Sequence, residues 1–311
     1  MSESSLAFVF PGQGSQSLGM LAALAGEHPV VVETFREAST VLGYDLWAVT
    51  QDGPEAELNR TDRTQPAMLA AGIAVWRVWQ NVHTARPSVV AGHSLGEYTA
   101  LVCAGAIGFR DAVRVVADRA RYMQEAVPEG QGAMAAILGL TDDEIRSVCS
   151  AASQGDVVEA VNFNAPGQVV VAGTAAAVSR AVEQARAAGA KRAITLPVSA
   201  PSHCSLMKPA SQRLAARLDD VLIQKPTIPV LHNVDAAPCD DPSGIRDRLV
   251  RQLYSPVLWV KTIESMRDRG VRRIVECGPG RVLAGLAKRI DRAIASVPVY
   301  DPVSVNKALE G

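Results

Sequence analysis

One short stretch of the sequence has the residue types of a serine nucleophile. Gly92-His-Ser-Leu-Gly96 fits the pattern G-x-S-x-G, between a short apolar run and a helical pattern. Its two glycines permit the sharp turn that lifts a serine hydroxyl above the edge of a sheet, at the start of the next helix. There the N–H of Leu95 can donate to an oxyanion, helped by the helix dipole. The pattern also occurs by chance, but this expected context favours Ser94 as a nucleophile.

A serine nucleophile needs a proton acceptor, and five histidines are candidates. Two of them lie in polar stretches typical of a solvated surface: His28 and His83. His93 adjoins the serine, and because neighbours on such a turn point in different directions, we expect it to pack or hydrogen-bond beneath the turn. His232, near a strand end, is interpreted as structural. His203, in a loop after Ala200-Pro-Ser, is expected at a cleft, but its position alone does not assign it the role of base.

An alternation of strands and helices must position these side chains. Short apolar runs predict strands at Leu6–Phe10, Ser88–Gly92 and Val271–Val275. Helical spacing predicts helices at Gln65–Gln80, Gly96–Cys103, Arg110–Ala126 and Val282–Ile290. The alternation favours an α/β fold, a large α/β-hydrolase-like domain with a parallel sheet wrapped by helices.

The segment from Ala133 to Pro197 has a different order of elements. Its pattern predicts strand, helix, strand, strand, helix and strand at Ala133–Leu138, Asp142–Ala152, Val157–Asn162, Gln168–Ala172, Ala175–Ala188 and Arg192–Leu196. That order is typical of a ferredoxin-like α+β unit. We therefore expect a small domain at 128–197, inserted into a large catalytic domain of residues 1–127 and 198–311. The cleft between them is a usual place for a ligand.

Composition and charge exclude several classes of function. The 31 basic and 32 acidic residues give a net charge of −1, so nothing indicates nucleic acid or an anionic membrane as a partner. The apolar run near the N-terminus is too short for a secretory signal, and no run is long enough to span a bilayer. Five scattered cysteines without a C-x-x-C pair indicate neither a zinc site nor a disulfide framework. We expect a reduced, soluble, cytoplasmic protein.

Several longer motifs resemble one family and occur in its order. They are Phe10-Pro-Gly-Gln-Gly-Ser-Gln16, Gly92-His-Ser-Leu-Gly-Glu-Tyr98, Arg119 to Met134, Asn162-Phe-Asn-Ala-Pro-Gly167, Pro201-Ser-His203, Asn233-Val-Asp235, Gln252-Leu-Tyr-Ser-Pro256 and Glu276-Cys-Gly-Pro-Gly280. With them the chain resembles, nearly end to end, the bacterial malonyl-CoA:acyl carrier protein transacylases. The acyltransferase domains of polyketide and fatty acid synthases are related to these enzymes. Several long motifs in order are far more specific than G-x-S-x-G alone.

The resemblance implies a role for six residues. Ser94 is the nucleophile and His203 its base, and the imidazole is oriented by a main-chain carbonyl, here that of Gln252, rather than by an acid. The oxyanion hole is implied at Gln13 and the Leu95 N–H. Arg119 holds the substrate carboxylate. Leu95 and the Ala200-Pro-Ser-His203 stretch resemble forms that take malonyl rather than methylmalonyl groups.

The implied reaction is ping-pong acyl transfer. The malonyl group passes from malonyl-CoA to the phosphopantetheine thiol of acyl carrier protein through a malonyl-serine ester, and supplies fatty acid or polyketide chain extension. The partners are malonyl-CoA and acyl carrier protein, with no nucleic acid and no membrane. Neither a cofactor nor a metal is expected. These partners and this chemistry come from the resemblance, not from composition or spacing.

The residues alone leave alternatives open. Arg119 lies close to Arg110, Arg114 and Arg121, so without the resemblance it reads as one of several helix-surface arginines. A serine hydrolase such as a thioesterase shares the serine turn but needs an acid, for which the candidates are Asp111, Asp118, Asp142, Asp143 and Asp156. A third reading is an idle scaffold that only binds acyl carrier protein, which an intact serine and histidine argue against.

One stretch of the chain has a local excess of positive charge. Residues 261–292 hold nine Lys or Arg and four acidic residues, and Lys288 and Arg289 are adjacent in a predicted helix. The resemblance implies an acidic carrier protein, so this stretch is a candidate docking surface. A solvated helix face explains the same charges equally well.

Overall fold

A five-stranded parallel sheet forms the centre of the larger part of the molecule. The computed structural model describes residues 5–198 and 200–310. Its strands are β1 (Leu6–Phe10), β2 (Val89–Gly92), β7 (Val230–Leu231), β8 (Arg273–Cys277) and β9 (Ala295–Val299), in the order β7-β2-β1-β8-β9. Every pair is parallel. Both faces of such a sheet are covered, which explains why its central strands are continuous apolar runs instead of alternating patterns.

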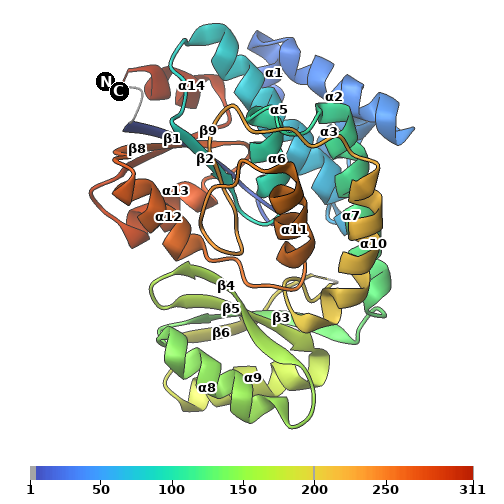
Figure 1. The fold of residues 1–311 in the computed structure, drawn as a ribbon, viewed down its shortest axis with the longest axis vertical. Helices are drawn as coiled ribbons and strands as arrows, with labels where there is room; N and C mark the ends of the chain where they lie inside the picture. Colours follow the sequence, from blue (N-terminus) through green and yellow to red (C-terminus); the bar gives the residue numbers. More distant parts are fainter. Residues whose placement is uncertain (1–4, 199, 311) are drawn as a thin grey trace.

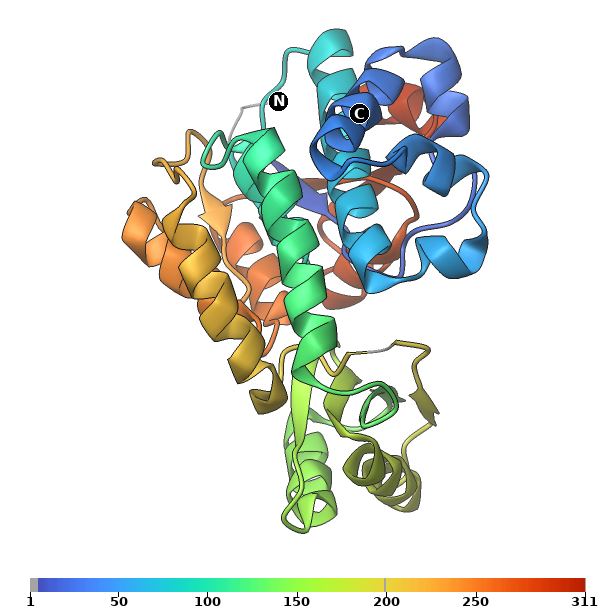
Figure 2. The ribbon, with the colours of Figure 1, turned by 90° about the vertical axis from the view of Figure 1, so that its right-hand side faces the viewer.

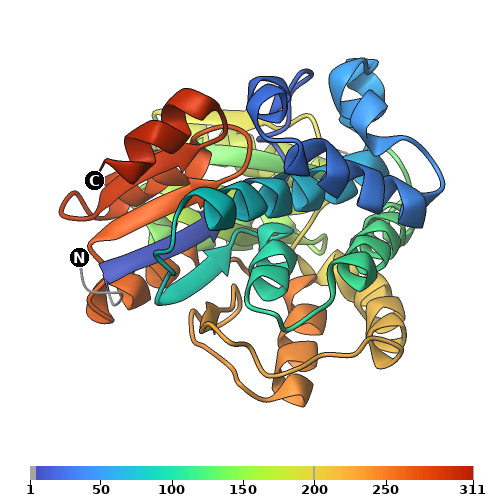
Figure 3. The ribbon, with the colours of Figure 1, turned by 90° about the horizontal axis from the view of Figure 1, so that it is seen from above.

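Helices cover both faces of this sheet, as the view from above shows (Figure 3). They are α1 (Ala22–Glu27), α2 (Val30–Leu42), α3 (Leu46–Gln51), α4 (Glu55–Leu58), α5 (Thr61–Val82), α6 (Gly96–Cys103), α7 (Phe109–Ala126), α10 (Lys208–Asp219), α11 (Pro242–Gln252), α12 (Trp259–Asp268), α13 (Val282–Ile290) and α14 (Pro302–Leu309). Ala7 and Val9 pack with α12 and α13. Phe8 and Phe10 lie in the cluster that contains α5 and α6. Alternate residues of β1 thus serve opposite layers.

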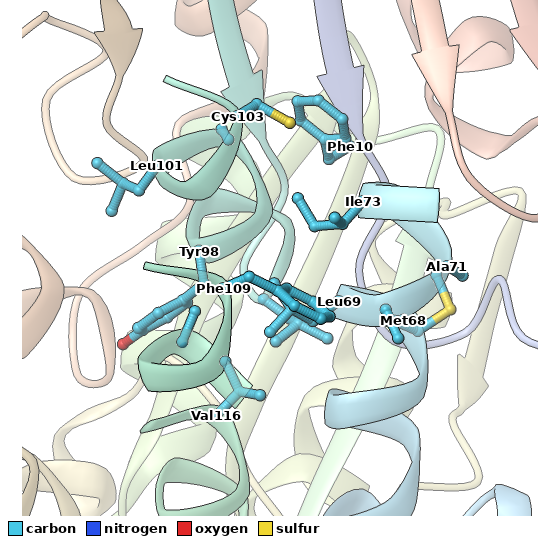
Figure 4. Packing of buried hydrophobic residues seen from close by; sticks show 14 of the residues in the cluster. Phe10, Met68, Leu69, Ala71, Ile73, Tyr98, Leu101, Cys103, Phe109 and Val116 are labelled. Atoms are coloured by element: carbon cyan, nitrogen blue, oxygen red, sulfur yellow. The ribbon is translucent and has the colours of Figure 1, made fainter. Parts of the chain in front are cut away.

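Aromatic and aliphatic side chains fix α5 and α6 against the end of β1. Figure 4 shows Phe10, Ile73 and Cys103 side by side, with Tyr98 and Leu69 further along the same cluster. The ring of Phe8 meets Trp76 and Trp79 edge to face, with centroids 5.4 and 5.0 Å apart. This packing holds the carboxyl ends of β1 and β2, and with them the turn at Ser94, in a rigid frame.

A second, antiparallel sheet lies at the other end of the molecule (Figure 1). Its strands are β3 (Gly132–Leu138), β4 (Val158–Ala165), β5 (Gln168–Thr174) and β6 (Arg192–Thr195), in the order β4-β5-β3-β6. The helices α8 (Asp142–Ser153) and α9 (Ala175–Ala187) cover one face and share a separate apolar cluster with it. Mixed α/β architecture with two distinct sheets is therefore confirmed.

Two passages of the chain and a pair of backbone hydrogen bonds join the sheets. Figure 2 shows α7 running from the larger part down to the antiparallel sheet, which it enters through residues 127–131. Backbone bonds also link β4 to the segment before α12, from Phe163 N–H to Val257 O and from Val257 N–H to Val161 O. After β6 the chain returns to a 3-10 turn, Ser205–Met207, and α10. His203 therefore lies on the return path.

Several predicted elements have different bounds in the structure, and two of them begin at least two residues from the predicted start. The strand expected at Val271–Val275 runs from Arg273 to Cys277, because Val271 bonds back to Met266 at the end of α12 instead of joining the sheet. The helix expected from Gln65 begins at Thr61, in a polar first turn that apolar spacing does not reveal. Within the described ranges, no helix is both long and apolar enough to cross a membrane.

Candidate active site

Ser94 lies on a tight turn between β2 and α6. Its backbone is left-handed, with φ of 51°, which is uncommon for a residue other than glycine. The turn leaves no room for side chains on either side. A Cβ built on Gly92 would lie 1.8 Å from the carbonyl carbon of Gly96, and one on Gly96 would lie 2.1 Å from Phe10 O. Both positions therefore require glycine, because any side chain there would clash with neighbouring backbone atoms.

His203 is hydrogen-bonded to the serine. Its Nε2 lies 2.7 Å from Ser94 Oγ, and its Nδ1 lies 2.7 Å from the main-chain oxygen of Gln252. A carbonyl oxygen can only accept, so Nδ1 carries the proton and Nε2 is free to accept the serine O–H. His203 is only 2% exposed. Burial, and secondarily the charge of Arg119, lowers its pKa to about 3, so the imidazole is neutral at physiological pH.

Arg119 is buried beside the same hydroxyl. Its Nη2 donates to Ser94 Oγ at 3.3 Å and to the side-chain oxygen of Gln252 at 3.0 Å, while Nη1 donates to Gln65 Oε1 at 2.8 Å. Both amide oxygens are neutral, and no ion pair of Arg119 is found within the described part of the chain. Burial lowers the pKa of the guanidinium, but an arginine stays charged. Its charge is therefore available to an anionic ligand.

The neighbouring arginines face away from the site. Arg114 pairs with Asp111 and Arg121 pairs with Asp118, each on the exposed side of α7. Arg110 is exposed as well. Only Arg119 of this group reaches the serine, which sequence spacing alone did not single out.

A small cavity of about 120 Å³ opens in front of the serine. Its wall includes Ser94, His203, Arg119, Gln13 and Leu95 together with apolar side chains, Met123, Met134, Leu196, Val198 and Ala200. The apolar residues come from α7, β3 and the return segment. The cavity therefore lies where the two sheets meet.

The loop after β1 brings Gln13 to this cavity. His93 N–H donates to Phe10 O at 3.0 Å, and a Cβ built on Gly12 would lie 2.6 Å from His93 O. The loop is thus packed directly against the serine turn. The N–H of Ser94 is already occupied, since it donates to Asn233 Oδ1 at 2.7 Å. The next N–H of the turn belongs to Leu95, which also lines the cavity.

The other histidines have different places. His93 was expected to pack or hydrogen-bond beneath the turn. It does both, with Nε2 2.8 Å from Asn164 Oδ1 and its ring against Trp259, but it lines the cavity, so the expected position is wrong. His232 lies beneath the turn, fully buried, with Nδ1 2.7 Å from Glu97 Oε1. His28 and His83 are half-buried and absent from the cavity wall.

The aspartates considered for a hydrolase triad lie elsewhere. Asp111 and Asp118 pair with arginines on α7, Asp156 pairs with Arg180, and Asp142 and Asp143 begin α8 in the solvent. His203 instead has the Gln252 carbonyl at the position that a triad acid takes. Nowhere in the described chain do three His, Cys, Asp or Glu side chains form a group that could hold a metal. Its five cysteines form no disulfide.

The sequence reasoning missed the polar side chains around the serine. Glu97 accepts three hydrogen bonds beneath the turn, Asn233 holds the serine N–H, and Gln65 holds Arg119. Glu97 and Asn233 lie in two of the motifs that carry the family resemblance. Their partners lie more than 130 residues away along the chain, so only the fold reveals the contacts.

Known proteins resemble this chain over nearly its whole length. The acyl transferase domain family matches residues 7–303. A malonyl CoA-acyl carrier protein transacylase of Salmonella typhimurium is 56% identical over 303 residues, 97% of this chain and 98% of the relative. The crystal structure of an acyl carrier protein S-malonyltransferase from Vibrio cholerae has 56% identity and a TM-score of 0.96, over 98% of this chain and 99% of that one. Another similar structure is that of a malonyl-transacylase in complex with its type II PKS acyl-carrier protein. It has 56% identity and a TM-score of 0.97, over 98% of this chain and 99% of that one.

Proposed function

This chain belongs to the acyl transferase family, among its malonyl CoA-acyl carrier protein transacylases, and we propose that it works through a malonyl ester of Ser94. The enzyme transfers the malonyl group of malonyl-CoA to acyl carrier protein. One observation carries the proposed mechanism: His203 Nε2 and Arg119 Nη2 both reach the same Ser94 Oγ, at 2.7 and 3.3 Å. A base and a carboxylate-binding cation thus converge on one nucleophile.

The first half-reaction forms the ester. His203 Nε2 accepts the proton of Ser94, and the serine oxygen attacks the thioester carbonyl carbon of malonyl-CoA. The tetrahedral intermediate collapses as the C–S bond breaks. The sulfur of coenzyme A leaves with the proton that His203 had taken, so the imidazole is neutral again. Its low pKa favours this return of the proton.

Two donors are proposed to stabilise the oxyanion of that intermediate. The Leu95 N–H stands at the start of α6, where the helix dipole favours negative charge. Gln13 lines the same cavity, on the loop that packs against the serine turn. Fixed donors of this kind lower the barrier because they need no reorganisation as charge develops.

Arg119 is proposed to bind the free carboxylate of the malonyl group. In a malonyl ester the carboxylate is separated from the ester carbonyl by a single CH₂ group. The Arg119 guanidinium already lies 3.3 Å from the oxygen that carries the ester, so it is within reach of that carboxylate. Two neutral amides hold the guanidinium and leave its charge for the substrate.

The second half-reaction transfers the group. The phosphopantetheine thiol of acyl carrier protein enters after coenzyme A has left, and His203 accepts its proton. The sulfur attacks the ester carbonyl, the C–O bond to Ser94 breaks, and the proton returns to the serine oxygen. Exchange between two thiols involves no change of oxidation state. We therefore propose that no cofactor takes part.

We also propose a finer description of the two parts of the fold and a cellular location for the protein. The larger part, residues 1–127 and 198–311, is α/β-hydrolase-like, a reading supported by its parallel sheet and by the serine between β2 and α6. The part at 128–197 is an inserted ferredoxin-like domain. Its order β4-β5-β3-β6 sets the first strand of the unit between the third and fourth, as that unit requires. Five unpaired cysteines support a reducing, cytoplasmic location.

Carrier dependence separates this function from that of a thioesterase. The enzyme is mixed with malonyl-CoA, with and without holo acyl carrier protein, and free malonate and malonyl-carrier are measured. Transfer predicts that coenzyme A release beyond one equivalent requires the carrier and yields malonyl-carrier. Steady release of malonate without the carrier would show a hydrolase instead. A carrier lacking phosphopantetheine is the matched control.

A further inference from the structure

A buried carboxylate beneath the serine has no part in the chemistry described above. Glu97 lies in the first turn of α6 and is completely buried. It accepts hydrogen bonds from His232 Nδ1 at 2.7 Å, from the Asn233 N–H at 3.0 Å and from Gln252 Nε2 at 2.8 Å. A buried charge costs free energy unless it is fully bonded, so its presence here calls for a reason.

The Gln252 side chain links this carboxylate to Arg119. Its Nε2 donates to Glu97 Oε2 and to the main-chain oxygen of Ser94, at 2.8 and 2.9 Å, while its Oε1 accepts from Arg119 Nη2 at 3.0 Å. An arginine can only donate and a carboxylate can only accept. Only one orientation of the amide satisfies both neighbours.

The opposite orientation would be repulsive at both ends. A flipped Gln252 amide would direct its NH₂ group at the Arg119 guanidinium and its oxygen at the Glu97 carboxylate. The carboxylate thus determines which end of the amide the guanidinium meets. Glu97 acts on Arg119 through this amide and does not pair with it directly. A direct ion pair would neutralise the charge that the substrate carboxylate needs.

We propose that Glu97 is a positioning residue for substrate selection. Its carboxylate holds the Gln252 amide in the orientation that places the Arg119 guanidinium against an acyl group on Ser94. The proposal rests on the proposed function, in which Arg119 binds the malonyl carboxylate. Glu97 touches neither the substrate nor the reacting atoms, so its effect is on the choice between acyl groups.

A purely structural role is the competing explanation. Glu97 also bonds Asn233, whose side chain accepts from the Ser94 N–H and donates to Gly92 O. Loss of the carboxylate could therefore disturb the serine turn itself. Such a disturbance would slow acylation by every acyl-CoA alike. The ratio of malonyl to acetyl transfer is the quantity that separates the two roles.

The test measures single-turnover acylation of Ser94 by malonyl-CoA and by acetyl-CoA, each over a range of concentrations. Glu97→Ala should reduce the malonyl-to-acetyl ratio of kcat/KM by about 10- to 100-fold, the loss expected when one hydrogen bond to a charged group is released. The loss should fall mainly on malonyl-CoA. Glu97→Gln should keep most of the ratio, because one amide oxygen can replace Oε2, which accepts from both Gln252 and Asn233.

A second buried carboxylate provides the matched control. Glu276 is completely buried and accepts from the N–H groups of Leu283 and Ala284 at the start of α13, outside the cavity wall. Glu276→Ala should lower the melting temperature but leave the acyl ratio unchanged. If Glu97→Ala fails to fold, Gln252→Met replaces it, since it removes the amide while the main-chain carbonyl still holds His203. Gln252→Met should also reduce the malonyl-to-acetyl ratio of kcat/KM.

The outcomes distinguish the inference from the function on which it rests. A wild-type ratio in folded Glu97→Ala, or in Gln252→Met, at whatever overall rate, would overturn the positioning role. Equal acylation of the wild-type enzyme by malonyl-CoA and acetyl-CoA would contradict the role of Arg119 itself. A reduced malonyl-to-acetyl ratio in both Glu97→Ala and Glu276→Ala would show that removal of any buried carboxylate lowers this ratio. That result would also overturn the inference.

Discussion

The imidazole of His203 is held by the backbone of Gln252, with 2.7 Å between Nδ1 and the main-chain oxygen. A carbonyl fixes the tautomer as an acid does, but it carries no charge that would stabilise an imidazolium. After burial, the Arg119 cation is the largest cause that lowers the pKa of the imidazole, so it disfavours protonation. The proposed base is therefore a neutral imidazole with a low proton affinity, which favours release of the proton that it accepts.

This geometry predicts an unusual pH profile. The pKa of His203 is lowered to about 3, whereas an unperturbed histidine titrates near 6.5. The neutral imidazole is the active form, so a lowered pKa keeps it active as the pH falls. Acylation by acetyl-CoA, which has no carboxylate of its own to titrate, should keep its rate between pH 7.5 and about pH 5.

Arg119→Ala is the companion variant for this measurement. Removal of the cation should move the acidic limb upward, because the largest cause of the low pKa after burial is gone. Circular dichroism at each pH verifies that the protein remains folded. An acidic limb centred near pH 6.5 in the wild-type enzyme would contradict the neutral, buried base.

Selectivity through Arg119 is the second prediction. With malonyl bound, the guanidinium gains a charge-assisted pair, and with acetyl bound it stays desolvated and without that partner. Truncation of one side of such a pair costs on the order of 2–5 kcal/mol. Arg119→Ala should thus lose most malonyl transfer, while acetyl transfer holds or rises. Arg119→Lys should rescue it only partly, because a point charge cannot reproduce the planar fork.

Two neighbours on the same helix serve as controls. Arg114 and Arg121 form exposed ion pairs on the other side of α7, and their Ala variants should keep the malonyl preference. Equal loss of malonyl and acetyl transfer in Arg119→Ala would assign the residue to the fold or to coenzyme A binding. A preserved preference in that variant would place the carboxylate site elsewhere.

Much of the fold was predictable because local patterns and tertiary packing agree. Buried parallel strands such as Leu6–Phe10 have to be apolar throughout, and Gly92 and Gly96 are required by direct backbone contacts. The start of α5 at Thr61 was missed, since its first turn is polar although Thr61 and Thr64 are buried. A side chain that is buried by contacts far away in the chain leaves no periodic signal.

Some residues of the site are likewise indicated by local sequence patterns, and others are revealed only by the fold. Ser94 lies in a local motif with its own geometry, so the residues alone indicated it. His203 and Arg119 gained their roles from resemblance, and the structure now brings both to the serine hydroxyl. Glu97 and Gln65 received no role, because their contacts join α6 and α5 to distant segments. His93 was misplaced, since the direction of a side chain on a strained turn depends on the packing around it.

The basic surface of α13 gives the third prediction. Lys288 and Arg289 are exposed, and Arg289 reaches Gln168 on β5 at the edge of a groove that Lys191 and Arg192 also line. Attraction between this surface and an acidic carrier would concern only the second half-reaction. Lys288→Glu with Arg289→Glu should raise the KM for acyl carrier protein and leave acylation by malonyl-CoA unchanged.

A charge reversal of the same kind elsewhere is the control for docking. Lys307 is exposed on α14, and Lys307→Glu should leave the carrier KM as it is. The effect of the α13 changes should shrink at higher salt, because exposed charges are screened. An unchanged carrier KM in the double variant would leave these residues as a solvated helix face.

The covalent ester on Ser94 is the central claim, and intact-mass spectrometry tests it most directly. The protein is mixed with malonyl-CoA without a carrier, the reaction is quenched in acid, and the intact mass of the protein is measured. The modified peptide is then sequenced. The account predicts one added malonyl group on the peptide that contains Ser94, none in Ser94→Ala, and loss of the added mass when holo acyl carrier protein is supplied. An adduct on a cysteine, or one that persists in Ser94→Ala, would contradict it.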